Sequence, residues 1–271
     1  HQSHGGVDRL MAAFIKCNDL VVHHMFRRGA GGPAIIFANS LGTDLRIWDA
    51  VVDLLPAEIP FLRYDKRGHG LSESGPISIE ILADDLIALM EKLSLTKALV
   101  CGVSVGGLIA KQLATARPDL VSGLVLSNTS YQIGDPTSWA ERIDALEAGG
   151  LEPLADGIME KWFSLAFREN ETEALAGYRA MLTRTPIRAY IDTCAAIRDA
   201  DLSGAVRGIA VPSLCIAGSE DRATPPDRVR ALAGRIPEAE YNCLDGVGHL
   251  PSIEDPHAIA KAIMNMHRQL T

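Results

Sequence analysis

Short apolar runs alternate with longer helix-like segments through most of the chain. These runs, each apolar or β-branched in the main, lie at 34–38, 61–64, 98–101, 123–126, 213–217 and 241–244. Strands that alternate with helices are the signature of a mostly parallel sheet covered on both faces. Two earlier runs, at 14–17 and 20–26, flank Asn18-Asp19 and predict a hairpin at the edge of the sheet. The pattern therefore predicts an α/β layered domain.

This alternation stops between about 130 and 206, where no convincing strand occurs. Helix-compatible segments there carry aromatic residues at Trp139, Trp162, Phe163, Phe167, Tyr178 and Tyr190. A helical insertion between two strands predicts a lid over the carboxyl edge of the sheet. Most of these rings are expected to pack within the lid, and one or two to line a pocket. We therefore divide the chain into a first core segment at 11–129, a helical lid at 130–206 and a second core segment at 207–271.

Composition and charge narrow the class of partner. The chain has 271 residues, of which 47% are hydrophobic and 22% charged, as is usual for a folded protein. Its net charge of -8 argues against a nucleic-acid or anionic-membrane surface, because both need clustered Lys and Arg. No apolar run is long enough to span a bilayer. We expect a small-molecule partner, no nucleic acid and no membrane.

Cysteine usage and the first residues bear on location. The cysteines are Cys17, Cys101, Cys194, Cys215 and Cys243, an odd number without a C-x-x-C pair. Several lie within apolar, strand-like runs, where a buried, inert thiol is expected, and a reducing, cytoplasmic compartment fits this usage. The opening residues lack the apolar core of a secretion signal. We interpret residues 1 to about 10 as an added or loose extension and Met11 as a candidate natural start.

A Gly-x-Ser-x-Gly string stands between a predicted strand and a predicted helix. Gly102-Val103-Ser104-Val105-Gly106 is followed by a stretch at 108–116 without Gly or Pro. In this context the string predicts a nucleophile elbow, a sharp turn that lifts a serine hydroxyl above the sheet edge. Both glycines are needed where a Cβ would collide. Because serine alone is a weak nucleophile, the prediction requires an acid and a histidine elsewhere.

An acid and a histidine follow the last two predicted strands. Asp221 and His249 lie just past strand ends, where an open parallel sheet binds its ligands. We predict that His249 takes the proton of Ser104, and that Asp221 orients the imidazole and stabilises its charged form. Each motif alone is weak, but the three rarely occur in this order by chance. Glu220 and Asp245 are the alternative acids, of which Asp245 precedes His249 too closely to reach around its ring.

Acyl transfer also needs amide donors for the oxygen that becomes negative. The amide of Val105, at the start of the helix after the elbow, is one candidate. The other is the amide of Leu41, in the loop 39–43 after the strand at 34–38. Ser40 is a candidate substrate-binding residue, although the side chains of Asn39 and Ser40 can instead only shape the turn.

Other polar positions have a structural interpretation. The charged stretch 63–72 ends in a Gly-rich turn, and we expect its side chains to tie neighbouring loops together. His69 is therefore not our catalytic base. His257 and His267 are expected to face solvent on the terminal helix. No string with metal-ligand spacing such as H-E-x-x-H occurs, so no metal is predicted.

At these residues the chain resembles the α/β-hydrolase superfamily, from about residue 17 to the end. Several stretches resemble the 3-oxoadipate enol-lactonases within it, namely 39–43, 63–70, 127–129 and 133–142. The resemblance implies an α/β-hydrolase fold, a mostly parallel sheet with helices on both faces and a helical lid. Val105 departs from related elbows, which often carry Met there; the backbone donor survives this change.

The resemblance also implies a substrate, 3-oxoadipate enol-lactone, that bears a free carboxylate. A cation is needed to receive that group, and Arg142, one helical turn after Trp139, is the candidate, with Trp139 as a neighbouring pocket residue. The alternative, that Arg142 is a solvated lid charge, stays open. Ser104 would open the lactone to an acyl-enzyme that water then hydrolyses, without a cofactor.

Two other functions stay open. One is a general carboxylesterase or carbon-carbon bond hydrolase with the same three residues, and the other is a ligand receptor that keeps the hydrolase scaffold. Turnover separates the enzymes from the receptor, and the choice of substrate separates the enzymes from each other. The sequence makes no prediction about oligomeric state.

Overall fold

The computed structural model describes residues 12–271. Our interpretations of residues 1–10 and of Met11 lie outside these residues. No helix within 12–271 is both long and apolar enough to cross a membrane.

The core is an eight-stranded sheet with strand order β1-β2-β4-β3-β5-β6-β7-β8. The strands are β1 (Ala13–Cys17), β2 (Leu20–Arg27), β3 (Ile35–Ala38), β4 (Phe61–Tyr64), β5 (Ala98–Val103), β6 (Val121–Ser127), β7 (Ser213–Gly218) and β8 (Ala239–Leu244). The hairpin β1-β2 joins β4 by antiparallel pairing, and all other pairs are parallel. The predicted strands are confirmed, with ends that differ by up to two residues.

The hairpin turn follows from its two polar residues. Asn18 and Asp19 both have positive φ, at 48° and 67°, which a two-residue turn matched to the twist of its strands requires. Asn and Asp tolerate this conformation better than other residues with a Cβ.

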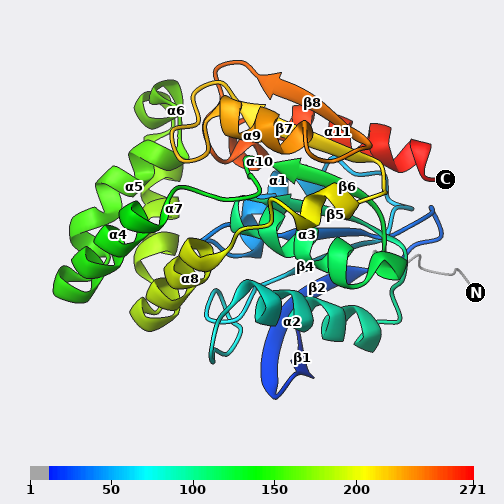
Figure 1. The fold of residues 1–271 in the computed structure, drawn as a ribbon, viewed down its shortest axis with the longest axis horizontal. Coiled ribbons are helices and arrows are strands. Elements are labelled where there is room, and N and C mark those ends of the chain that lie inside the picture. Colours follow the sequence, from blue (N-terminus) through cyan, green and yellow to red (C-terminus); the bar gives the residue numbers. More distant parts are fainter. Residues whose placement is uncertain (1–11) are drawn as a thin grey trace, which may run out of the picture.

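Helices cover both faces of the sheet (Figure 1). They are α1 (Asp49–Val52), α2 (Ile79–Lys92), α3 (Val105–Ala116), α9 (Pro226–Ala233), α10 (Pro251–Glu254) and α11 (Pro256–Gln269), with short 3-10 turns η1 (Leu45–Trp48), η2 (Pro118–Leu120), η3 (Glu152–Leu154) and η4 (Ala205–Gly208). Helices α2 and α3 pack against each other, and α3 contacts β5. Helix α11 packs against α1 and α10. Ser78 starts α2 as a side-chain cap, accepting from the Ile81 amide at 3.1 Å.

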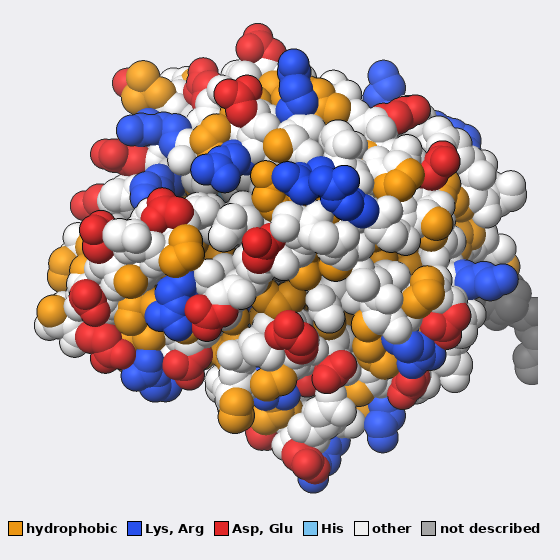
Figure 2. Space-filling view, viewed as in Figure 1, with side chains coloured by type: hydrophobic (Ala, Val, Ile, Leu, Met, Phe, Trp, Pro, Cys, Tyr) orange, Lys and Arg blue, Asp and Glu red, His pale blue; other side chains and the backbone are white. Residues whose placement is uncertain are grey.

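The segment predicted as a lid holds the helices between β6 and β7, and we keep the name lid for it. These are α4 (Pro136–Gly149), α5 (Ala155–Trp162), α6 (Leu165–Asn170), α7 (Thr172–Thr183) and α8 (Ile187–Asp199). They form a group at the left of Figure 1, and the arrowheads of β6, β7 and β8 point toward them. Phe163 stacks on Phe167 with ring centroids 4.3 Å apart, so these two rings pack within the lid. Acidic and basic side chains are interspersed over this part of the surface (Figure 2).

The terminal helix corrects one expectation. His257 is exposed, as predicted, but His267 is buried, and its Nε2 lies 2.9 Å from the carbonyl oxygen of Pro33. Position 267 follows Ile263 by four residues and therefore shares the buried face of α11. The sequence shows this periodicity, but it does not show that the carbonyl group of Pro33 lies within hydrogen-bonding distance of the His267 imidazole.

Candidate active site

Ser104 occupies a strained turn between β5 and α3. Its backbone has φ 57° and ψ -119°, a combination that L-residues rarely adopt. A Cβ on Gly102 would lie 2.3 Å from the carbonyl oxygen of Gly106, and a Cβ on Gly106 would lie 2.1 Å from that of Ala38. Glycine at both positions therefore lets the turn close and brings it against the end of β3.

Asp221 and His249 follow β7 and β8 and contact each other. His249 Nδ1 lies 2.8 Å from Asp221 Oδ2, and both residues are buried, with 4% and 3% exposed. Glu220 and Asp245 are exposed. Of the three acids considered from the sequence, the structure therefore places Asp221 beside the imidazole.

Asp221 is held by four hydrogen-bonding groups. Its Oδ1 accepts from the amides of Ala223 and Thr224 at 2.8 and 2.9 Å, and its Oδ2 also accepts from Asn128 Nδ2 at 3.0 Å. Asn128 follows β6, and its Nδ2 also donates to the carbonyl oxygen of Gly248 at 3.1 Å. The carboxylate therefore has a single orientation, which suits it to fix the imidazole. Sequence reasoning did not assign Asn128 to the site, because the contact spans strands β6 and β7.

Ser104 and His249 line the same cavity. The two side chains line a space of about 210 Å³, together with Ser40 and Leu41 of the loop after β3. Ser104 Oγ makes no hydrogen bond to a residue within 12–271; catalytic hydrogen bonds of this kind often tighten only when substrate binds. The topology thus brings four sequence-predicted positions to the same edge of the sheet.

The backbone amides of Val105 and Leu41, the two predicted oxyanion donors, lie in different surroundings. Val105 is the first residue of α3, and the first amides of a helix have no partner within it. Leu41 is buried at 7% exposure and lines the cavity beside Ser104. Neither amide donates to a group of the described chain. Both are therefore free to meet an oxygen of a bound substrate.

A model of the alpha/beta hydrolase family matches residues 20–262. The chain belongs to the alpha/beta hydrolase family. The fold expected from the sequence is therefore confirmed.

Within this family the chain is similar to proteins named as enol-lactonases. It is 30% identical to 3-oxoadipate enol-lactonase 2 of Acinetobacter baylyi, over 92% of this chain and 94% of that protein. It is 32% identical to 3-oxoadipate enol-lactonase 1 of the same organism, over 83% and 84% of the two chains. The solved structure of the enol-lactonase from Burkholderia xenovorans LB400 superposes with a TM-score of 0.89 at 36% identity, covering 94% of this chain and 99% of that one. The resemblance stated from the sequence is confirmed.

The predicted substrate-binding residues of this hydrolase all line the cavity. Trp139 and Arg142 reach it from α4, and Ser40 from the loop after β3. Trp139 is fixed by its Nε1, which donates to the carbonyl oxygen of Ile133 at 2.7 Å. The guanidinium of Arg142 lies 5.0 Å from the centre of the Trp139 ring, within the range of a cation-π contact.

Two further cations line the same cavity and were not predicted. They are Lys161, from α5, and Arg222, which follows Asp221 directly. Neither these two nor Arg142 forms an ion pair with a carboxylate in residues 12–271. Burial lowers the pKa of Lys161, and the nearby charges of Arg142 and Arg222 lower it further. The position of Arg222 beside the predicted acid was a usable signal in the sequence; Lys161 had none.

The side chains of Asn39 and Ser40 also shape their turn. Asn39 Nδ2 donates to the carbonyl oxygen of Tyr64 at 2.7 Å, and its Oδ1 accepts from Trp48 Nε1 at 2.6 Å. Ser40 Oγ lies 2.9 Å from Thr43 Oγ1. The hydroxyl of Ser40 is therefore engaged within the loop although the residue lines the cavity, and its role in substrate binding stays a prediction.

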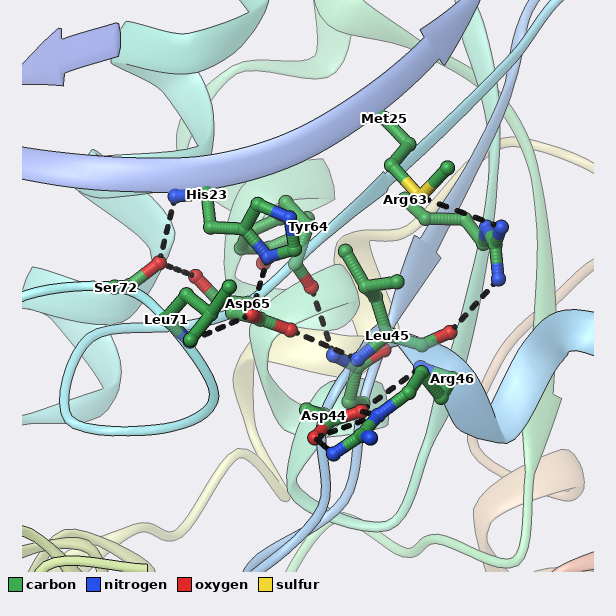
Figure 3. Close-up of polar contacts among 11 residues, drawn as sticks. His23, Met25, Asp44, Leu45, Arg46, Arg63, Tyr64, Asp65, Leu71 and Ser72 are labelled. Carbon is green, nitrogen blue, oxygen red and sulfur yellow. Dashed lines mark hydrogen bonds and ion pairs between the residues drawn. The ribbon is translucent and has the colours of Figure 1, made fainter. Parts of the chain in front are cut away.

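The stretch 63–72 ties loops together, as predicted. The buried Asp65 carboxylate accepts from the amides of Leu45 and Leu71 at 2.8 and 2.9 Å and lies 2.7 Å from His23 Nδ1. Figure 3 shows Asp65 between these partners, with Ser72 linking the same turn to β2. His69 is buried in this region, where desolvation and the charge of Lys66 hold its pKa well below its usual value.

Proposed function

We propose that this protein is a serine hydrolase that opens the lactone ring of 3-oxoadipate enol-lactone to give 3-oxoadipate through an acyl-enzyme. The observation that carries the proposal is one cavity lined by Ser104, by the Asp221-bound His249 and by three cations without carboxylate partners. The similarity to enol-lactonases supports the choice of lactone.

The first half of the reaction acylates the serine. His249 Nε2 accepts the proton of Ser104 as Oγ attacks the lactone carbonyl, and Asp221 stabilises the imidazolium. The amides of Leu41 and Val105 donate to the oxyanion of the tetrahedral intermediate. The bond between the carbonyl carbon and the ring oxygen then breaks. Conjugation stabilises the leaving enolate, which takes the proton from His249 and becomes a ketone.

The second half releases the product. His249 removes a proton from water as the water attacks the acyl carbonyl, and when the tetrahedral intermediate collapses the His249 imidazolium gives that proton to the departing Ser104 Oγ. The bond between Oγ and the acyl carbon breaks, and 3-oxoadipate leaves with two carboxylates. The chemistry needs no redox change.

Arg142, Lys161 and Arg222 provide the charge complement of this substrate. A free carboxylate that enters a partly dry pocket needs a cationic partner, and charge-assisted hydrogen bonds are stronger than neutral ones. Three cations in one cavity repel each other: burial is the main cause of the lowered pKa of Lys161, and the charges of Arg142 and Arg222 add to it. An anionic ligand relieves that repulsion, which favours a carboxylate-bearing lactone over a neutral ester.

The test is turnover by purified protein of authentic enol-lactone, whose conjugated absorbance disappears on ring opening. Ser104→Ala should fold normally and lose about 10⁴-fold or more in kcat, as expected when a triad member is removed. Near-normal activity of that variant contradicts the serine mechanism. Faster hydrolysis of short neutral acyl esters than of the lactone would instead favour a general carboxylesterase, and only a few turnovers on either would favour a receptor.

A further inference from the structure

A buried lysine contacts the loop that carries the candidate oxyanion amide. Lys66 follows β4 and is 3% exposed, and its Nζ donates to the carbonyl oxygen of Ser40 at 2.5 Å. Strands β3 and β4 are parallel neighbours, so the loops after them meet at the same edge of the sheet.

The carbonyl of Ser40 is fixed by three donors. Besides Lys66 Nζ, it accepts from Thr43 Oγ1 at 2.8 Å and from the amide of Thr43 at 3.3 Å. The peptide bond between Ser40 and Leu41 is trans, as are all described peptide bonds. In a trans peptide the C=O and N–H groups point in opposite directions. Fixing the Ser40 oxygen on one side therefore fixes the Leu41 N–H on the other.

The ammonium also changes the strength of that donor. A cation on the carbonyl oxygen draws electron density through the peptide and makes its N–H more positive, because hydrogen bonds in a chain polarise one another. The effect is largest in a poorly solvated site, and Lys66 is buried. Both Ser40 and Leu41 line the cavity that holds Ser104.

The backbone next to Lys66 is also held in place. The neighbouring Asp65 is bound from three sides, by Leu45, Leu71 and His23 (Figure 3). No carboxylate within residues 12–271 forms an ion pair with Lys66. Burial lowers its pKa to about 7, and the charges of Asp65 and Asp44 counteract this only in part. Burying an ammonium against a single backbone carbonyl is costly.

We propose that Lys66 is a positioning residue of the oxyanion hole, which holds and polarises the Ser40-Leu41 peptide so that the Leu41 amide stabilises the tetrahedral intermediate. This inference rests on the serine mechanism of the proposed function. Lys66 contacts no reacting atom and acts through the peptide.

The test compares Lys66→Met with wild type under steady-state conditions. We expect kcat to fall about 10- to 100-fold, somewhat less than when an oxyanion donor is removed outright, while KM stays within about twofold. A trifluoromethyl ketone that forms a tetrahedral adduct with Ser104 should bind more weakly by the same factor, measured by inhibition and by the ¹⁹F signal of the adduct. A merely structural role would lower the melting temperature without this kcat-against-KM split.

Two other variants keep the outcome decisive. Thr43→Val removes a second donor to the Ser40 carbonyl at similar volume and should lower kcat about 3- to 10-fold, whether or not Lys66→Met folds. Lys111→Met is the matched control, because Lys111 is also fully buried but donates to Thr129 Oγ1 instead, at 3.1 Å. Its kcat should stay within about twofold of wild type, since the Ser104 carbonyl keeps its bonds from Thr129 Oγ1 and the Gly107 amide.

Unchanged kcat in both Lys66→Met and Thr43→Val overturns the proposal, as does an equal loss in Lys111→Met. The ratio of variant to wild-type kcat is measured both on the enol-lactone and on 4-nitrophenyl acetate. If the wild type hydrolyses only the acetate ester, the result counts against the proposed function, and the comparison of Lys66→Met with wild type can still be made on that ester. If the wild type turns over neither, the adduct affinity of the trifluoromethyl ketone still decides the role of Lys66.

Discussion

The backbone amide of His249 donates to the carbonyl oxygen of Trp162 at 3.0 Å. Trp162 is the last residue of lid helix α5, so the loop that presents the imidazole is joined directly to the lid. Glu254 strengthens the junction, because it accepts from the amides of Gly248 and Ser164 at 2.9 and 3.2 Å. Lid position and imidazole position are therefore mechanically linked.

Gly248→Ala should disturb this junction. A Cβ there would lie 2.9 Å from the Ser164 amide nitrogen and 3.0 Å from the Trp162 carbonyl oxygen. We expect a loss of about 1 to 3 kcal/mol in stability from overpacking, and a fall of about tenfold or more in kcat because the adjacent imidazole moves. Gly204→Ala, with no atom within 4 Å of its Cβ, is the control. Normal kcat in Gly248→Ala would show that lid and imidazole are independent.

Asn128→Gly should weaken the orientation of Asp221. The substitution removes the amide that donates to the carboxylate and to the Gly248 carbonyl, while glycine tolerates the φ of 52° at this position. We expect kcat/KM to fall about tenfold, since a lost buried hydrogen bond costs about 1 to 3 kcal/mol. The matched control is Asn18→Gly, at φ 48° in the β1-β2 turn. An equal loss of activity in both variants would refute the role of Asn128.

Removing cations from the cavity should affect charged substrates selectively. Arg142→Ala and Lys161→Met should each raise KM for the carboxylate-bearing lactone about tenfold and leave KM for a neutral ester within about twofold. Added salt should reduce the difference between wild type and variant. Arg188→Ala changes a lid arginine that is 62% exposed at its side chain and pairs with Glu147, and it should leave both KM values unchanged. Equal shifts for both substrates would remove the cations from carboxylate binding.

Lys111→Met should stabilise the fold in a pH-dependent way. Burial lowers the pKa of Lys111 from 10.5 to about 7. Between these values the unfolded chain binds more protons than the folded one, so wild-type stability rises with pH over this range. The variant lacks this dependence and should exceed wild type by about 1 to 4 kcal/mol near pH 7, with the gap shrinking toward pH 10. Urea denaturation at both ends of the range measures it.

The control for this comparison is Lys16→Met, at an exposed position of β1. Its stability difference from wild type should be the same at both pH values. A gap for Lys111→Met that stays constant or widens with pH would contradict the assignment of a buried, readily deprotonated lysine.

Local sequence was sufficient for most of the architecture. Apolar runs bounded by turn residues located the central strands β3, β5 and β6, because a strand buried on both faces must be apolar throughout. The string from Gly102 to Gly106 predicted the elbow, and the structure shows the close approaches that exclude a Cβ at its two outer glycines. The prediction that His267 faces solvent was wrong, because its hydrogen-bonding partner, the Pro33 carbonyl, lies near the other end of the chain.

The amino-acid sequence by itself determined the succession of strands and helices along the chain, the helical insertion and the polar residues that follow the strands at the edge of the sheet that holds the cavity. Only the tertiary structure decided that Asn128 supports Asp221, that Lys161 and Arg222 join Arg142, and that Lys66 meets the Ser40 carbonyl. The physical reason is the separation along the chain of the residues that interact. Strand and turn propensities act between neighbours in the chain, whereas these contacts join segments that become neighbours only when parallel strands align their ends.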